Sequence, residues 1–324
     1  MTALATAATA RPRPARAWRA ILRLHQPALV VWGVFVAVVS AVLLWAYGPG
    51  GNAANAAWRQ KCTVDLCDAD YSIDGYHLAY RFSEAAVGFL PVLVALWAGG
   101  LLIGRELENG TAELTWTQAV SPARWLAAKL AVPAALLTAG TTLLVLLHRL
   151  LFDAHQVPEG WNWSDSGTFE TNGPIAVAFP LLGLALGALG GLAVRRAVAG
   201  LAVAAVTTLI ARTLVLWASP HLWPWKSAVS SLPHGYPPKT AAIYGDKGAV
   251  TATGAHIPDP CTGAGKACPA AHDVVGHYRD LHPSSQFWPL QLTETALILT
   301  VAALATAAAF ALLHRRTNTK GTAV

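Results

Sequence analysis

Residues 85–129 read AAVGFLPVLVALWAGGLLIGRELENGTAELTWTQAVSPARWLAAK, an apolar run without charges followed by a polar, charged loop. Five further apolar runs lie on either side of this stretch, and only 12% of all residues are charged. Each run approaches the roughly 20 residues that a helix needs to cross a hydrocarbon core. One such run can be a buried core helix, but six predict an all-α polytopic membrane protein. The six expected transmembrane helices are residues 28–47, 85–102, 130–147, 175–194, 198–217 and 295–313.

The distribution of Lys and Arg predicts the orientation in the membrane, because basic residues are retained on the cytoplasmic side. With six spans, both termini share one side. The segments on that side hold 13 basic residues, whereas the longer segments on the other side hold nine. We therefore expect both termini in the cytoplasm, with residues 48–84, 148–174 and 218–293 outside. The net charge of +6 then serves contact with inner-leaflet lipids, and no nucleic-acid partner is predicted.

Composition divides the chain into four parts. For residues 1–27 we expect a cytoplasmic tail and, from about residue 15, a basic helix that lies at the membrane interface. The same basic residues could also act simply as a positive-inside anchor of the first span. Residues 28–217 hold the first five spans and the loop at 104–126. Residues 218–293 contain half of the 20 prolines and predict a long, irregular extracellular loop. Residues 294–324 hold the sixth span and a basic cytoplasmic tail.

All four cysteines fall in the expected outer segments, as Cys62, Cys67, Cys261 and Cys268. An oxidising exterior favours disulfides, and four cysteines allow three pairings. Two local bonds, 62–67 and 261–268, are the favoured arrangement, while a pairing across the loops stays open. Zinc is the rival because histidines flank the second pair, but no compact ligand motif supports a metal site.

No motif predicts catalysis by this chain. The run GAGK at 263–266 resembles the end of a nucleotide-binding loop, but Pro260 replaces the leading glycine and Ala267 the closing hydroxyl residue. The histidines of residues 218–293 have no Ser, Cys or carboxylate partner at a diagnostic spacing. We therefore predict no catalytic residue, no metal and no directly bound cofactor.

Three ionisable residues lie within or next to the spans. Arg212 lies near the outer end of the fifth span, and Glu84 and Glu294 lie at the outer ends of the second and sixth. Their matching depth makes either glutamate a candidate partner of Arg212, in an ion pair that closes an outer gate or meets a polar substrate. The alternative is that all three side chains reach the headgroups independently.

The fourth span carries a repeated small residue at every fourth position, as Gly183, Gly187 and Gly191. Such a ridge allows two helices to approach closely in a membrane. The pattern predicts close helix packing, either within one chain or between two.

The loop after the second span has more order than a plain connector requires. The Asn-Gly pair at 109–110 is a turn signal, Thr111 can begin a helix, and the Ser-Pro pair at 121–122 ends that segment. Trp116 gives the segment an apolar face and Gln118 a polar one. The pattern predicts a short helix parallel to the membrane that presents charge to the cytoplasm.

The run Glu-x-Gly-Thr-Ala at 108–112, with Trp-Thr-Gln downstream and Arg-Trp at the start of the next span, resembles the permease subunits of actinobacterial ABC type-2 exporters. The resemblance implies that the loop forms a coupling helix, which docks in a groove of a separate ATPase subunit that holds ATP and Mg. The basic segment at 15–26 would correspond to the family's elbow helix. The residues implied in coupling are Arg105, Glu106, Glu108, Gly110, Thr111, Trp116, Thr117 and Gln118.

On this resemblance, the chain is the permease subunit of an ATP-driven exporter in a bacterial plasma membrane, paired with a second copy or a second permease. ATP hydrolysis would belong to the ATPase, and this chain would not be an enzyme. A path lined by apolar side chains suits a lipophilic or amphipathic compound. Two alternatives are a membrane sensor or binding protein that acts through its outer loops, and a membrane-embedded enzyme.

Overall fold

The computed structural model describes residues 26–62, 70–118, 120–154, 157, 161–262 and 268–321. Within these ranges, six helical segments are long and apolar enough to cross a membrane, which confirms the predicted number. The basic segment expected to form an interfacial helix at 15–26 lies outside the described residues, apart from Gln26.

Most of the spans extend beyond the apolar runs that predict them, whereas the fourth has the predicted bounds. The first is α2 (Gln26–Trp45), which continues through a kinked π-helical turn (Ala46–Gly50) into α3 (Gly51–Lys61). The second is α4 (Tyr71–Leu96), followed by a π-helical segment (Trp97–Gly104) and α5 (Arg105–Glu108). A short helix, α6 (Thr111–Gln118), leads to the third span, α7 (Pro122–Ala154). After α8 (Ser166–Thr171), the remaining spans are α9 (Ile175–Val194), α10 (Ala197–Ala218) and α12 (Phe287–Gly321).

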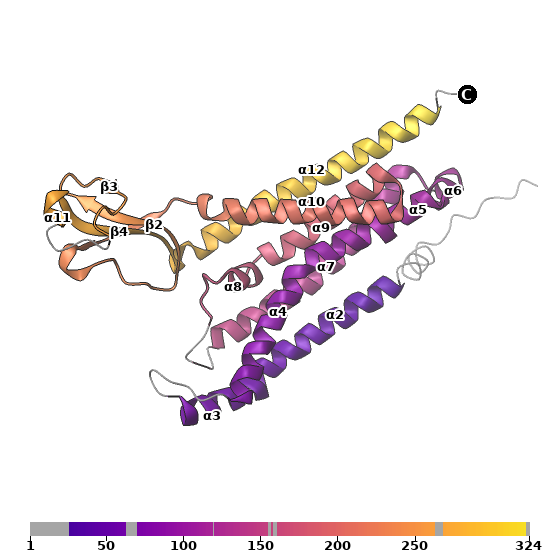
Figure 1. The fold of residues 1–324 in the computed structure, drawn as a ribbon. Coiled ribbons are helices and arrows are strands. Elements are labelled where there is room, and N and C mark those ends of the chain that lie inside the picture. Colours follow the sequence, from indigo (N-terminus) through magenta and orange to yellow (C-terminus); the bar gives the residue numbers. More distant parts are fainter. Residues whose placement is uncertain are drawn as a thin grey trace, which may run out of the picture.

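The connecting elements gather at two opposite ends of the helix bundle (Figure 1). One end, called here the loop end, holds α5, α6 and the C-terminal part of α12. The other end, called the sheet end, holds α3, α8 and the strands. This separation agrees with the count of Lys and Arg, which predicts that residues 104–126 and the C-terminus share one side of the membrane.

The helix α9 lies at the centre of the bundle and packs against α4, α7, α10 and α12. Its sequence is apolar all round, so that every face can be buried. The glycine ridge of α9 faces α4 and the π-helical segment. A Cβ placed on Gly187 would lie 2.7 Å from the carbonyl oxygen of Ala95, and one placed on Gly191 would lie 2.7 Å from that of Gly99. Gly183 likewise meets the backbone of Pro91, so the ridge packs within one chain.

We expect Gly187→Ala to lower the free energy of unfolding by about 1–3 kcal/mol, because the added methyl group forces two helix backbones apart. Gly33→Ala is the matched control, since a Cβ at that position of α2 would meet no described atom within 4 Å apart from its chain neighbours and its own helix backbone. That change should be neutral or slightly stabilising, because it restricts the unfolded chain. Thermal unfolding in detergent, followed by Trp fluorescence, compares the two. Equal stability of the two variants would contradict the close packing.

Residues 218–293, expected to be irregular, contain a four-stranded antiparallel sheet in the order β1-β4-β2-β3. The strands are β1 (Lys226–Ser231), β2 (Ala242–Thr251), β3 (His256–Ile257) and β4 (Val274–Pro283). The expectation is wrong because the prolines of this segment lie between strands or at a strand end, where they remove no ladder hydrogen bond. The fold is thus mostly helical, with one sheet between α10 and α12.

The disulfide prediction is confirmed where the structure describes both partners. Cys261 and Cys268 are bonded to each other, just before the short helix α11 (Cys268–Ala271) continues towards β4. This bond uses both thiols that a zinc site at the pair would need. Cys62 is also disulfide-bonded, and its favoured partner Cys67 lies outside the described residues.

Candidate functional site

The loop between the second and third spans folds as two short helices joined by a tight turn. α5 continues directly from the π-helical segment, and α6 begins at Thr111, as the sequence predicts. Gly110 joins them with a φ of 71°, a left-handed conformation that glycine adopts without strain. The hydroxyl of Thr111 donates a hydrogen bond back to the carbonyl oxygen of Glu106 at 3.2 Å. The turn therefore has a defined geometry.

The two faces of α6 differ sharply. On the inner face, Ala112 is fully buried, and Trp116 packs edge to face against Trp125 with ring centroids 5.5 Å apart. On the outer face, Thr111 and Thr117 are exposed, and Leu114 between them is 59% exposed. Thr111, Leu114 and Thr117 are three positions apart, so they share one side of the helix. This side is opposite the one that carries Ala112 and Trp116. The side chain of Gln118 lies outside the described part of the chain.

The carboxylate of Glu106 points into the protein. The sequence pattern had suggested instead that the loop presents its charges to the cytoplasm. Its carboxylate accepts hydrogen bonds from the Lys129 ammonium and from the indole N–H of Trp125, the latter at 3.2 Å. Lys129, on the first turns of α7, is only 6% exposed. A buried cation of this kind needs an anionic partner. Glu106 therefore fixes the end of the second span to the start of the third.

Two further carboxylates fix the loop to the turn between α9 and α10. A carboxylate oxygen of Glu108 accepts a hydrogen bond from the backbone N–H of Ala197 at 2.8 Å, at the first turn of α10, where anions are favoured. Glu113 forms an ion pair with Arg195 at 2.8 Å, and both side chains are about 40% exposed. Arg195 ends α9 with a φ of 57°. The loop is thus attached to the third, fourth and fifth spans.

Of the predicted coupling residues, the structure therefore separates an anchored set from an exposed set. Glu106, Glu108 and Trp116 hold the loop in place, whereas Arg105, Thr111 and Thr117 are exposed. Sequence reasoning did not assign Glu113, Lys129, Arg195 or the exposed Leu114 to the site. The position of Leu114 between two threonines is a signal that an amphipathic analysis of α6 could have used.

At the sheet end, Arg212 forms its ion pair with a residue that the sequence did not suggest. Its guanidinium lies 2.6 Å from a carboxylate oxygen of Glu170 in α8, and it also donates to the carbonyl oxygen of Gly88. The predicted pairing with Glu84 or Glu294 is wrong, because α8 folds back onto the bundle and brings its own carboxylate. Burial raises the pKa of Glu170, although the guanidinium beside it acts in the opposite direction.

The two glutamates that were candidates for this pair have neutral partners instead. Glu84 accepts a hydrogen bond from the Thr168 hydroxyl at 2.7 Å, and Glu294 accepts one from the Ser219 hydroxyl. Both partners belong to segments that connect the spans at the sheet end. In the described residues, no three His, Cys, Asp or Glu side chains converge so that they could hold a metal ion.

Comparison with known proteins identifies the family to which the helical part of this molecule belongs. No curated protein and no solved structure matches the chain. The family described as ABC-2 membrane transporter related matches residues 27–219, from the first span to the end of α10 and short of the sheet. Because this match covers more than half of the sequence, the chain belongs to the ABC-2 membrane transporter related family and is a membrane subunit of a transporter.

Proposed function

We propose that this chain is the permease subunit of an ATP-driven exporter and that α6 docks onto a separate ATPase subunit. The observation that carries the proposal is the two-faced α6, which is fixed to the bundle on one side and exposes Leu114 on the other. An apolar side chain flanked by exposed hydroxyl groups matches the composition of a protein interface, which has an apolar centre and a polar rim. ATP and Mg would be held by the ATPase, and this chain would carry out no bond chemistry.

The contacts of the loop supply a route for mechanical coupling. A displacement of α6 would reach α7 through the Glu106–Lys129 pair and through the contact of Trp116 with Trp125. It would reach α9 and α10 through Glu113 and Glu108. Because each contact is short and direct, the cytoplasmic ends of four spans would move together with the loop.

The remaining parts of the proposal concern the setting of the transporter. The loop end would lie in the cytoplasm of a bacterium and the sheet end outside its plasma membrane, as the count of Lys and Arg indicates. A second permease subunit, identical or related, would complete the path. The faces of α10 that expose Val206, Leu209 and Leu214 are available for lipid or for such a subunit. The cargo would be lipophilic or amphipathic.

We expect Leu114→Glu to abolish capture of the ATPase while leaving the permease folded in the membrane, because the Leu114 side chain is already 59% exposed. Affinity purification of tagged protein in mild detergent, followed by mass spectrometry, measures the captured ATPase. Ala123→Glu is the matched control, since Ala123 is exposed at the loop end but lies outside α6. Leu114→Met should retain the partner. Full capture of the ATPase by Leu114→Glu would refute docking through α6.

A sensor or binding protein that acts through the outer segment is the second candidate, and the sheet is the observation that favours it. The ring of Tyr236 lies 5.4 Å from the Lys247 ammonium and 5.9 Å from the Arg279 guanidinium, so this surface combines aromatic and basic groups. A sensor needs no ATPase, so absence of any nucleotide-binding partner from the purified wild-type protein would favour it.

A further inference from the structure

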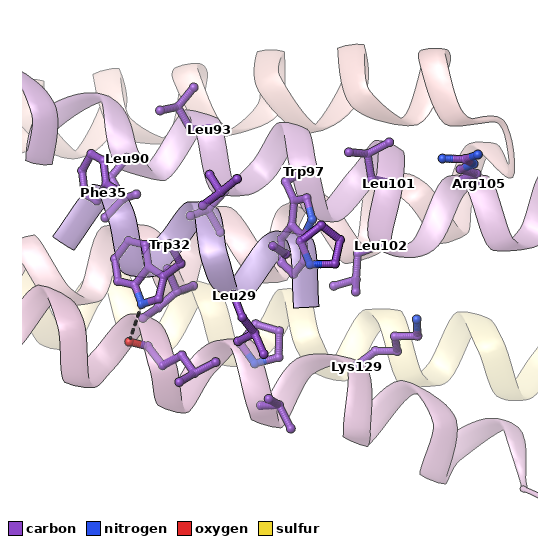
Figure 2. A pocket seen from close by; sticks show the side chains of 18 of the residues that line it. Leu29, Trp32, Phe35, Leu90, Leu93, Trp97, Leu101, Leu102, Arg105 and Lys129 are labelled. Carbon is purple, nitrogen blue, oxygen red and sulfur yellow. Dashed lines mark hydrogen bonds between the residues drawn. The ribbon is translucent and has the colours of Figure 1, made fainter. Parts of the chain in front are cut away.

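A cavity of about 620 Å³ opens between α2, α4 and α7, outside the surface assigned to the ATPase. Its volume lies in the range of sites for small molecules. Most of its wall is apolar, and Figure 2 shows Trp32, Phe35, Leu90 and Leu93 towards one end with Trp97 further along. The cavity therefore offers an elongated apolar surface within the depth of the spans.

On the wall formed by α2, the polar edge of Trp32 is occupied by a hydrogen bond. The indole N–H of Trp32 donates to the carbonyl oxygen of Leu136 in α7 at 3.2 Å, which ties the first span to the third. The ring of Trp32 stacks on Phe35 with centroids 5.5 Å apart and planes 18° from parallel. With its N–H satisfied, the Trp32 indole offers only apolar ring atoms to the cavity, as Phe35 does.

The opposite end of the cavity is charged. Arg105, Glu106 and Lys129 line it next to the loop, and Figure 2 shows Arg105 and Lys129 beyond Leu101 and Leu102. Lys129 is neutralised by Glu106. Arg105 is exposed and forms no ion pair with any acidic residue that the structure describes. The lining therefore carries one uncompensated positive charge, at the end that would lie at the inner leaflet.

We propose that this cavity binds an anionic amphipathic molecule from the inner leaflet, with its head at Arg105 and its tail along Trp97, Leu93 and Trp32. An anionic head would complement the unpaired guanidinium, whereas a cationic head would meet two cations and one carboxylate. The distance along the second span from Arg105 in α5 to Leu90 in α4 is about 20 Å for a helix, which suits an acyl chain. That such a molecule is the cargo of the transporter rests on the proposed function.

The position of the site also links occupancy to the loop. The Glu106–Lys129 pair is at once a wall of the cavity and the attachment of the loop to α7. A bound anion beside Arg105 would act on the same charges that fix α6. Occupancy and ATPase docking would then be coupled reciprocally, as any two linked binding events are.

Photoaffinity labelling of the full-length protein in phosphatidylcholine nanodiscs tests the proposal. Two probes carry the same diazirine-labelled tail, one on phosphatidylglycerol and one on phosphatidylcholine. We expect the anionic probe to label peptides of α4 and α7 about tenfold more than the zwitterionic probe, the size of effect of one charge-assisted contact. Inorganic phosphate at millimolar concentration should leave the labelling unchanged, because it supplies the head without the tail.

Two variants and two matched controls separate the head site from the tail site. Arg105→Gln should remove the preference for the anionic probe, and Leu93→Trp should reduce labelling by both probes because it fills the cavity. Arg124→Gln changes an exposed arginine at the same end, and Leu304→Trp changes an exposed leucine of α12. Both controls should label as the wild type does.

Several results would overturn the proposal. Equal labelling of the wild type by both probes would show that the site has no preference for an anionic head group. Competition by phosphate alone would show that the site binds a simple anion and does not need the tail. Labelling of α4 and α7 that appears only after deletion of residues 1–20 would assign the cavity to the chain's own N-terminal segment. The assay contains no ATPase, so its failure leaves the Leu114 experiment untouched, and failure of ATPase capture leaves the labelling interpretable.

Discussion

Replacement of Arg212 by Ala should lower the free energy of unfolding by about 3–5 kcal/mol, because it leaves a buried carboxylate without its partner. The side chain of Glu170 is only 12% exposed, and that of Arg212 is 22% exposed. The guanidinium also satisfies the carbonyl oxygen of Gly88 in α4, so the change frees groups on two other elements. The loss should loosen the contact of α8 with the fifth span, while the hydrogen bond from Thr168 to Glu84 still joins α8 to the second.

Thermal and denaturant unfolding of the purified protein in detergent measures this effect. The double variant Arg212→Ala/Glu170→Ala should be more stable than Arg212→Ala alone, because it leaves no unpaired charge. Arg212→Lys should lie between the wild type and Arg212→Ala, since one ammonium cannot match the planar fork of a guanidinium to two acceptors. If the double variant is no more stable than the single one, the ion pair is not what holds α8.

The membrane helices were predictable because the hydrocarbon core imposes its own length on an apolar run. The predicted bounds of α9 agree with the structure, since α9 is apolar from end to end. The start of α4 was placed at residue 85, but the helix begins at Tyr71, where Asp70 accepts a hydrogen bond from the backbone N–H of Ser72. Hydropathy detects the part inside the membrane and cannot detect a polar extension of the same helix.

The sheet was missed because its order lies in pairings between distant residues. β4 pairs with β1, for example Ala228 with Arg279, and with β2 on its other side. Neither β1, with the sequence KSAVSS, nor β2, with the sequence AIYGDKGAVT, has the strong alternation of apolar and polar residues that would mark a half-buried strand. The disulfide at Cys261 and Cys268 could be anticipated because the two cysteines lie only seven positions apart in the sequence.

The loop illustrates the same limit at the level of single side chains. Its turn and its helix follow from Gly110 and Thr111, which are local signals. The direction of each carboxylate does not, because Lys129 is 23 residues from Glu106 and Ala197 is 89 residues from Glu108. Charges that look solvated in sequence are used here to join helices that only the fold brings together.

Replacement of Glu106 by Lys should lower the free energy of unfolding by about 3–5 kcal/mol and abolish ATPase stimulation in the reconstituted complex, because it sets two ammonium groups against each other in a buried site. The side chain of Lys129 is only 8% exposed. Glu113→Lys, in a pair whose side chains are about 40% exposed, should cost no more than about 1 kcal/mol.

The charge exchange Glu106→Lys/Lys129→Glu decides whether Glu106 acts inside the permease or on the ATPase. If the pair is an internal attachment, the exchange should recover most of the stability and also the capture of the ATPase. Recovery should be incomplete, because the indole N–H of Trp125 loses its acceptor. If Glu106 instead contacts the ATPase, the exchange should restore stability but not capture. Capture that returns together with stability would assign docking to the exposed face of α6 and leave the carboxylate to transmit the motion.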